Sequence, residues 1–347
     1  MLEGLRKPSE LIIIVITLLA YGCPIQAIVH AYGLDERTVA SWRDRAGKHC
    51  EQLHHALILQ GKLDLLHVQA DEIRVKGRGL IAWMGLALMV SSRLWLAGVV
   101  SQSRESRLAD RLMQQVRAAS QASCAVLVAT DGWHAYPSAI MRAFRDKVKR
   151  QPGPGRACLP VWPQLCIATI IKRKEKSYVV EMVRLMSRGT ITQAERLLWA
   201  SRGGNALNTS FIERFNGTMR ERLATLTRKC RHAAQRIGTL QTGMYLIGTT
   251  YNWCLAHQEL SSRRHAGFSC TPAMAAGLTD HIWSVAEVLT YKVAPQPWVP
   301  PKRGKRADKQ PKAQPMGPKR PRGRPRKHPL PEQELPKRPR GRLRTVA

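Results

Sequence analysis

The sequence predicts an α/β protein: a mixed sheet flanked by helices, preceded by an all-α helix-turn-helix module and followed by a disordered basic tail. Three observations support this prediction. Short apolar runs between residues 65 and 130 have the length of strands, and residues 8–47 carry the start and stop signals of short helices. Residues 293–347 combine proline with lysine and arginine and have few large apolar side chains.

The charge of the chain indicates a polyanionic partner. The 347 residues have a formal net charge of +32 and a sequence pI near 10.7. Residues 295–347 hold 17 Lys/Arg against 3 Asp/Glu, so the remaining part of the chain is also strongly basic. Nucleic acid is the commonest partner of such a protein, and an anionic membrane surface is the competing interpretation.

Two apolar stretches bear on the membrane interpretation. Leu11–Ala20 is too short to span a bilayer and lacks a cleavage site of the signal-peptide type. Leu80–Val100 is longer, but Ser91, Ser92 and Arg93 interrupt it at its midpoint. Two strands joined by a polar turn explain this stretch better than one membrane helix, so we expect no membrane partner.

The cysteines indicate a reducing compartment. Eight cysteines are scattered along the chain without a CxxC pair, which favours free thiols over disulfides or a zinc module. Cys50 with His54 and His55 lacks a second pair of ligands, and we interpret residues 51–63 as a solvated linker helix. A cytoplasmic protein associated with the bacterial nucleoid is expected.

Residues 1–50 are predicted to form a helix-turn-helix DNA-binding domain. Its first helix spans about Pro8–Tyr21, and Pro24 opens the second in its first turn. Gly33 can adopt the positive φ of a helix end, and Asp35 is placed to cap a third helix over Glu36–Ala46. A small helical bundle without DNA affinity is the alternative. The residues expected on the exposed face toward a major groove are Arg37, Thr38, Ser41, Arg43 and Arg45.

The sheet is predicted from the next segments. Leu65–Val75, Leu80–Val90 and Leu94–Val100 read as three consecutive antiparallel strands because their connections are short. An amphipathic helix follows at about Ser103–Ser120. Cys124–Thr130 is a continuous apolar run of the kind found in buried parallel strands, and it ends directly at an aspartate.

The remaining elements complete this domain, which we assign to residues 64–292. A helix begins near Tyr136, a further strand is expected at Cys166–Ile171, and part of a helix at Gln193–Ala200. Asn208–Arg231 reads as a long helix. The order of three strands, helix, strand, helix, strand and helix resembles an RNase H-like core.

Three carboxylates of this domain are candidate metal ligands: Asp71 inside the first strand, Asp131 at the end of the next buried strand, and Glu213 in the first turn of a helix. Mg²⁺ prefers oxygen ligands, and two ions about 3.5–4 Å apart can assist an in-line displacement at phosphorus. Glu72 follows Asp71 on a strand, so we expect its side chain to face the opposite way and only Asp71 to reach the metal. Spacing alone also fits three solvated surface carboxylates.

The phrases around these residues are more specific. QADEI, TDGWHAYPSAI and NTSFIERFNGTMRERLA resemble the signatures of DDE transposases of bacterial insertion sequences, and TPAMAAGLTDHIWSVAEVL resembles the ending of members of that group. The resemblance covers about residues 8–290 and implies an RNase H-like integrase core. It implies that Asp71, Asp131 and Glu213 are the catalytic residues and hold Mg²⁺ or Mn²⁺. Asn208, Arg214 and Asn216 would lie nearby, and Arg220 and Arg222 would meet DNA phosphates.

The expected function is therefore DNA transposition. Such an enzyme cleaves phosphodiesters at the ends of an insertion sequence and joins the 3′-OH to target DNA by two-metal transesterification. Joining two ends requires two active sites, so a homodimer or higher oligomer on DNA is expected. The alternative is a non-catalytic DNA-binding protein, either a regulator or a decayed transposase.

The tail contains a candidate DNA-binding motif. Residues 321–327 resemble an AT-hook, in which glycine lets the backbone enter a narrow minor groove and flanking arginines lie along its floor. Residues 339–344 are a weaker copy. A generic polybasic tail that binds phosphates is the alternative. The residues expected in the groove are Arg322, Gly323, Arg324, Pro325 and Arg326.

Overall fold

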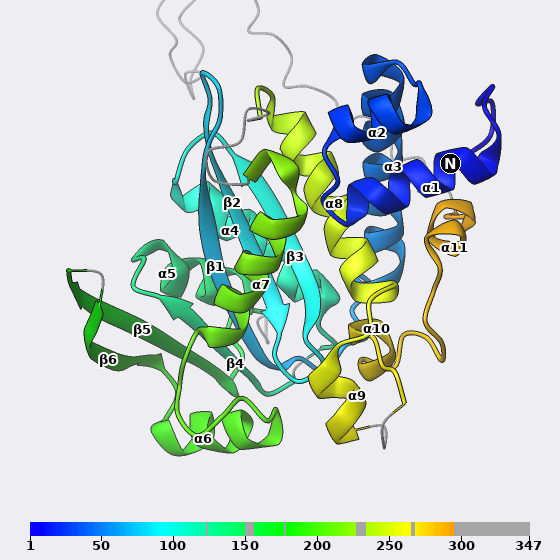
Figure 1. Ribbon diagram of the computed structural model, residues 1–347. Coiled ribbons are helices and arrows are strands. Elements are labelled where there is room, and N and C mark those ends of the chain that lie inside the picture. The colour runs from blue at the N-terminus through cyan, green and yellow to red at the C-terminus, as the bar shows by residue number, and fades with distance from the viewer. Residues whose placement is uncertain (123, 150–155, 177, 227–233, 265–267, 295–347) are drawn as a thin grey trace, which may run out of the picture. The chain divides into compact units, whose positions relative to one another are not determined.

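The computed structural model describes residues 1–294 apart from 123, 150–155, 177, 227–233 and 265–267 (Figure 1). In these residues, six strands form one mixed sheet in the order β3-β2-β1-β4-β5-β6. The strands are β1 (Leu66–Lys76), β2 (Ile81–Met89), β3 (Leu94–Ser101), β4 (Val126–Asp131), β5 (Leu165–Glu175) and β6 (Tyr178–Arg188).

The strand directions agree with the predicted meander. β1, β2 and β3 are antiparallel neighbours, so residues 80–100 form a hairpin rather than one apolar helix. β4 runs parallel to β1, and β5 runs parallel to β4. β6 is an antiparallel edge strand that we did not predict. This order of strands is compatible with an RNase H-like fold.

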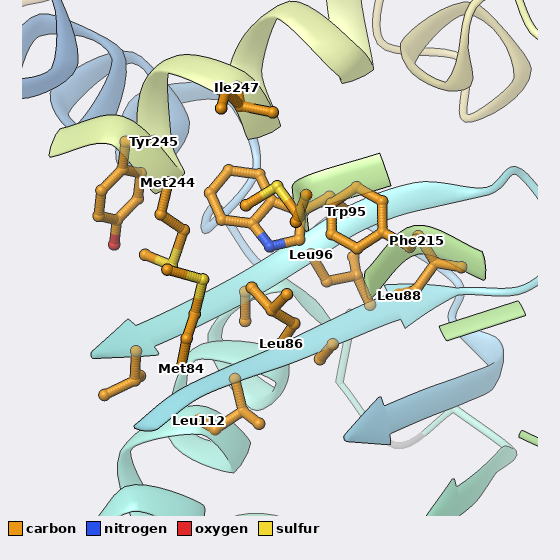
Figure 2. Packing of buried hydrophobic residues seen from close by; sticks show 14 of the residues in the cluster. Met84, Leu86, Leu88, Trp95, Leu96, Leu112, Phe215, Met244, Tyr245 and Ile247 are labelled. Carbon is orange, nitrogen blue, oxygen red and sulfur yellow. The ribbon is translucent and has the colours of Figure 1, made fainter. Parts of the chain in front are cut away.

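Helices cover both faces of the sheet. α4 (Ser106–Ala119) and α5 (Ala135–Ala143) pack on one face, and α6 (Ile191–Ala200), α7 (Ser210–Arg222) and α8 (Ile237–Trp253) pack on the other. Figure 2 shows Met244, Tyr245 and Ile247 of α8 on one side of β2 and β3, and Leu112 of α4 on the opposite side. The sheet is thus a buried middle layer.

Glycine allows α8 to approach the sheet closely. A Cβ on Gly248 would lie 2.2 Å from a ring carbon of Trp95, which is itself fully buried on β3. The side chain of Asn252, one turn further on, binds the backbone of Trp95 twice, through its oxygen and its nitrogen, at 2.9 Å each. α8 therefore packs on the edge strand β3 and also provides hydrogen-bond partners for the backbone of Trp95.

The N-terminal helices follow the predicted helix-turn-helix pattern. They are α1 (Ser9–Ala20), α2 (Ile25–Tyr32) and α3 (Glu36–Leu57). Gly33 ends α2 with a φ of 59°, and Asp35 caps α3 by accepting from the backbone N–H groups of Arg37 and Thr38. Pro24 lies at the N-cap of α2 rather than in its first turn.

The helix expected in residues 51–63 is present as far as Leu57, but it is the end of α3 and is not a separate, solvated linker. α3 continues through the expected break to Leu57 and packs along α8. Cys50, Leu53 and His54 are buried, and His54 Nε2 hydrogen-bonds to the carbonyl of Leu96 on β3 at 3.0 Å. The helix is one continuous element because its apolar stripe faces α8 and the sheet, not solvent.

The predicted long helix from Asn208 is shorter at both ends. Asn208 precedes α7, where its Oδ1 accepts from the backbone N–H of Ser210. α7 ends at Arg222, followed by the turn η1 (Ala224–Leu226). The chain continues after α8 through α9 (Gln258–Arg264), α10 (Pro272–Ala275) and α11 (Val285–Thr290). Among the described residues, no helix combines the length and apolarity needed to cross a membrane.

Candidate metal centre

Asp71 and Asp131 lie side by side on neighbouring parallel strands. The pairing of β1 with β4 ends at Ala70 and Thr130, so the two aspartates occupy the next position of each strand. Asp131 is the last residue of β4 and accepts from the backbone N–H of Trp133 at 3.1 Å. This placement at the carboxyl end of a buried parallel strand is the one the sequence predicted.

Glu72 also reaches this place, contrary to our expectation that only Asp71 would. One oxygen each of Asp71, Glu72 and Asp131 lie within 4.8 Å of one another. Adjacent strand residues do point to opposite faces, but the long side chain of Glu72 reaches Asp131 from the α5 side. There it pairs with Arg104 and accepts from Tyr136 Oη at 2.9 Å, and only 2% of its side chain is exposed.

Glu213 approaches from the other face of the sheet, on the first turn of α7. Its Oε1 accepts from Thr209 Oγ1 at 2.7 Å and pairs with Lys172 of β5. It lies outside the cluster of three oxygens, but lines the same cleft as Asp71 and Asp131. The three carboxylates singled out in the sequence therefore face one space from β1, β4 and α7.

Gln69 fixes the position of α7 against β1. Its Oε1 accepts from the backbone N–H groups of Phe211 and Ile212 at 3.0 and 3.1 Å, and its Nε2 donates to the carbonyl of Asn208 at 2.8 Å. The first N–H groups of a helix have no partner within the helix, and this fully buried side chain supplies one. At the next turn of α7, Asn216 Nδ2 donates to Asp71 Oδ2 at 2.8 Å.

The shared cleft has a volume of about 800 Å³ and mixes acids with bases. Arg104 pairs with Glu72 and Asp131, and its guanidinium lies 5.1 Å from the ring centre of Trp83 and 4.8 Å from that of Trp133. The lining residues are Asp71, Arg104, Asp131, Gly132, Trp133, His134, Ile170, Ile171, Lys172, Val179, Thr209, Glu213, Asn216 and Arg220.

The carboxylates disfavour each other's charge. Burial, with the nearby charge of Asp131, raises the pKa of Asp71 to about 6. Burial and the same aspartate raise the pKa of Glu72 to about 7, against the opposing effect of Arg104. Burial raises the pKa of Asp131 as well. A cation among these oxygens would relieve this repulsion.

The donor set fits a hard divalent cation. Every candidate ligand is a carboxylate oxygen, which suits Mg²⁺ and Mn²⁺ rather than a metal that prefers sulfur or imidazole. Asp71 and Asp131 face the cleft directly, and Glu213 faces it from α7. Glu72 has an oxygen close by but does not line the cleft. Asp71, Asp131 and Glu213 would therefore hold the metal, with Glu72 behind them.

The predicted DNA-binding residues of α3 divide into two groups. Arg37, Ser41 and Arg45 are exposed and spaced four residues apart, so they share one face of the helix. Thr38 is half-buried, and Arg43 is half-buried with its guanidinium on Asp44 at 2.8 Å. Of the five residues, only these first three therefore share an exposed face of α3.

The other predicted DNA contacts are spread over the molecule. Arg220 lines the acidic cleft, whereas Arg222 lines a separate pocket on the opposite face of α7. The motif residues Arg322, Gly323, Arg324, Pro325 and Arg326 lie outside the described residues. Sequence reasoning missed the contributions of Gln69, Glu72, Arg104 and Lys172. Of these four residues, only Glu72 could have been singled out from the sequence, because it is next to Asp71.

No protein-family model matches this sequence, and a search of curated proteins finds no match.

Proposed function

We propose that this protein is a DDE-type DNA transposase with an RNase H-like catalytic domain. The observation that carries the proposal is the approach of Asp71, Asp131 and Glu213 to one cleft from two parallel strands and a helix. The order β3-β2-β1-β4-β5, antiparallel over the first three strands and parallel between β1, β4 and β5, supports the RNase H-like assignment.

The charge of the chain supports DNA as the substrate. A net charge of +32 attracts a polyanion such as DNA to the protein as a whole. This overall attraction would offset the local repulsion between the DNA phosphates and the acidic cleft. Lys172 and Arg220 line the cleft beside the carboxylates. They are placed to bind the non-bridging oxygens of a phosphodiester while Asp71, Asp131 and Glu213 hold divalent metal.

The proposed reaction has two displacements at phosphorus. In the first, a water oxygen bonds to phosphorus, the P–O3′ bond breaks, and the released 3′ oxygen takes up a proton. In the second, the oxygen of that 3′-OH bonds to a phosphorus of target DNA, the target's own P–O3′ bond breaks, and the released target 3′ oxygen takes up the proton. Bound divalent metal supplies charge stabilisation to the attacking and leaving oxygens. The tie from Asn216 to Asp71 and the Gln69 clamp hold the carboxylates in place for both displacements.

A strand-transfer assay tests this proposal. The full chain is incubated with labelled duplexes made from the DNA that flanks its gene, a supercoiled plasmid target, and Mg²⁺ or Mn²⁺. We expect metal-dependent nicking and joining that Glu213→Gln abolishes. Glu181→Gln is the matched control, because Glu181 is similarly exposed (49% against 47%) and also paired with a cation, Arg173. Tight DNA binding without cleavage in either metal would favour the non-catalytic alternative.

A further inference from the structure

Helix α7 faces two separate cavities. Glu213, Asn216 and Arg220 line the acidic cleft, whereas Arg214, Thr218 and Arg222 line a different pocket. Spacings of three or four residues place each set on one side of a helix. The two cavities have no lining residue in common.

The second pocket, which we call the arginine pocket, has a volume of about 500 Å³. Its walls come from the turn between β2 and β3, one face of α7, the end of α8 and the segment that enters α9. The side chains that carry the argument are Arg93, Phe211, Arg214, Arg222, His257 and Glu259.

Arg93 is built into this pocket at a cost. It has a φ of 60°, a left-handed conformation that is strained for a side chain with a Cβ. Its side chain is 6% exposed. Its guanidinium lies 3.8 Å from the ring centre of Phe211 and donates to Glu259 at 2.8 Å and to the carbonyl of Val90. Among the described residues its Nε has no hydrogen-bond partner. A buried charged group with an unused donor is expensive unless a ligand completes it.

Further buried polar atoms of the pocket lack a partner among the described residues, and its arginines outnumber its carboxylates. Arg222 Nη1 and His257 Nδ1 are also buried and without a partner within the described part of the chain. Three arginines face a single carboxylate, that of Glu259. Burial lowers the pKa of His257, and the charges of Arg93 and Arg214 lower it further. The positive charge and unpartnered polar atoms of the pocket therefore favour the binding of an anion.

We propose that the arginine pocket binds a phosphate of the DNA backbone, as an anchor on the side of α7 opposite Glu213. Planar guanidinium groups with several N–H donors match the oxygens of a phosphodiester. The ligand's identity as DNA rests on the proposed function. Nine residues of α7 separate Glu213 from Arg222, a rise of about 13 Å, or about four base-pair steps along a duplex. Because the two sites lie on opposite faces of a helix about 10–12 Å in diameter, a DNA strand that meets both would have to pass around α7.

The test measures DNA binding in EDTA, where no cleavage occurs. Anisotropy of a labelled duplex is titrated with the full-length protein over a range of KCl concentrations. We expect Arg214→Gln and Arg222→Gln each to reduce the slope of log K against log[KCl] by about 1, the loss of one phosphate contact. Arg142→Gln is the control, since Arg142 lies on α5 across the sheet and pairs with Asp110. Pocket variants with the same slope as this control would overturn the proposal.

A second measurement identifies the phosphate. Duplexes with one uncharged methylphosphonate linkage are scanned through successive positions. At one position, the substitution should weaken binding by wild-type protein but not by Arg214→Gln. Arg222 also packs on the ring of Tyr21, so Arg214, which is exposed, is the variant that remains informative if Arg222→Gln unfolds. The inference would be contradicted if no position showed this coupling. It would also be contradicted if the pocket bound inorganic phosphate while the salt dependence of DNA binding stayed unchanged in the variants.

The outcomes separate this inference from the proposed function. Wild-type protein that binds no DNA in EDTA would contradict both. DNA binding with the expected slopes but without metal-dependent cleavage would leave the arginine pocket supported and remove the catalytic assignment. Metal-dependent cleavage, with salt slopes of DNA binding that do not change in the pocket variants, would support the catalytic assignment and remove the arginine pocket.

Discussion

Asn216 donates a hydrogen bond from its side-chain nitrogen to Asp71 Oδ2, a link between residues 145 positions apart in the chain. Asn216 is 2% exposed, so the bond is shielded from water. It ties the helix that carries Glu213 to the strand that carries Asp71. The acidic cleft thus depends on the docking of α7 as much as on the carboxylates themselves.

Removing this link should weaken metal binding. We expect Asn216→Ala to lower Mn²⁺ affinity and DNA nicking by about 10–100-fold, the usual effect of losing a partner of a metal ligand. Asn216→Asp loses the same donor but adds a carboxylate that attracts a cation, so it should lose less Mn²⁺ affinity than alanine. Calorimetric titration with Mn²⁺ checks the order. Equal affinity in all three proteins would show that the bond does not position Asp71.

Glu72 and Asp71 should respond differently to neutralisation. Asp71→Asn should lower metal-dependent nicking by more than about a hundredfold, since it removes a ligand rather than a partner of one. Glu72→Gln should cost less, because Glu72 does not line the cleft and is engaged by Arg104 and Tyr136. The comparison is made on plasmid nicking rates. A larger loss for Glu72→Gln would make it the metal ligand in place of Asp71.

The carboxylates should make stability depend on pH and metal. Because folding raises the pKa of Asp71 to about 6 and of Glu72 to about 7, their contribution to stability is full below about pH 4 and is lost as pH rises through these values. At pH 8 in EDTA, Asp71→Asn should therefore raise the Tm, by about 2–4 °C for each kcal/mol of relieved repulsion.

Mg²⁺ should stabilise the protein only at pH values where these carboxylates are ionised. Metal needs the anionic carboxylates, so excess Mg²⁺ should raise the Tm of wild-type protein at pH 8 and have little effect at pH 5. Scanning calorimetry with and without Mg²⁺ at both pH values measures this, with Asp71→Asn as the variant that should not respond. A Mg²⁺ effect of the same size at both pH values would argue against binding at these carboxylates.

The Gln69 clamp should contribute to global stability. Gln69→Ala would leave the backbone N–H groups of Phe211 and Ile212 buried without their acceptor, at a cost of about 1–3 kcal/mol. Urea unfolding measures the change. Gln69→Glu keeps an acceptor for these N–H groups but would bury a charge against two oxygens of Asn208, so at neutral pH it should destabilise at least as much as alanine. An unchanged free energy of unfolding for Gln69→Ala would mean that water replaces the clamp.

Two glycines on helices offer an opposed pair of stability predictions. Gly248→Ala should destabilise by about 1–3 kcal/mol, because its Cβ would overlap the ring of Trp95. Gly217→Ala on α7 should stabilise by about 0.5–1 kcal/mol, because a Cβ there meets nothing within 4 Å and alanine is the better helix former. Urea unfolding of both variants checks the opposite signs.

The sequence predicted the first half of the sheet well because its strands are apolar and closely connected. β1, β2, β3 and β4 were found within a few residues of their expected bounds. It did not predict α8, whose residues are buried nearly all round and so show no amphipathic period. Gly243 and Gly248 look like helix breakers in the sequence, but they are sites of close approach to Leu223 and Trp95.

β6 was missed for the opposite reason. Its side chains are mostly exposed, with Tyr178 at 78%, so alternation between a core and a solvent face is weak. Its place is set by pairing with β5, a relationship between strands that a single segment does not encode.

At the candidate metal centre, the sequence indicated the three carboxylates because short phrases surround them. The cations and clamps around them come from separate elements. Lys172 meets Glu213 from 41 residues away, and Arg104 meets Glu72 from 32 positions along the chain. Lysine and arginine are abundant in this chain, so no local pattern marks the two that face the acids.

The late position of α8 in the chain has a consequence for protein synthesis. Until residues 237–253 have left the ribosome, the face of Trp95 and Met84 that they cover has no partner. A product that stops before them would contain all three carboxylates yet expose this apolar face to water. Premature termination should therefore yield chains that aggregate or are degraded.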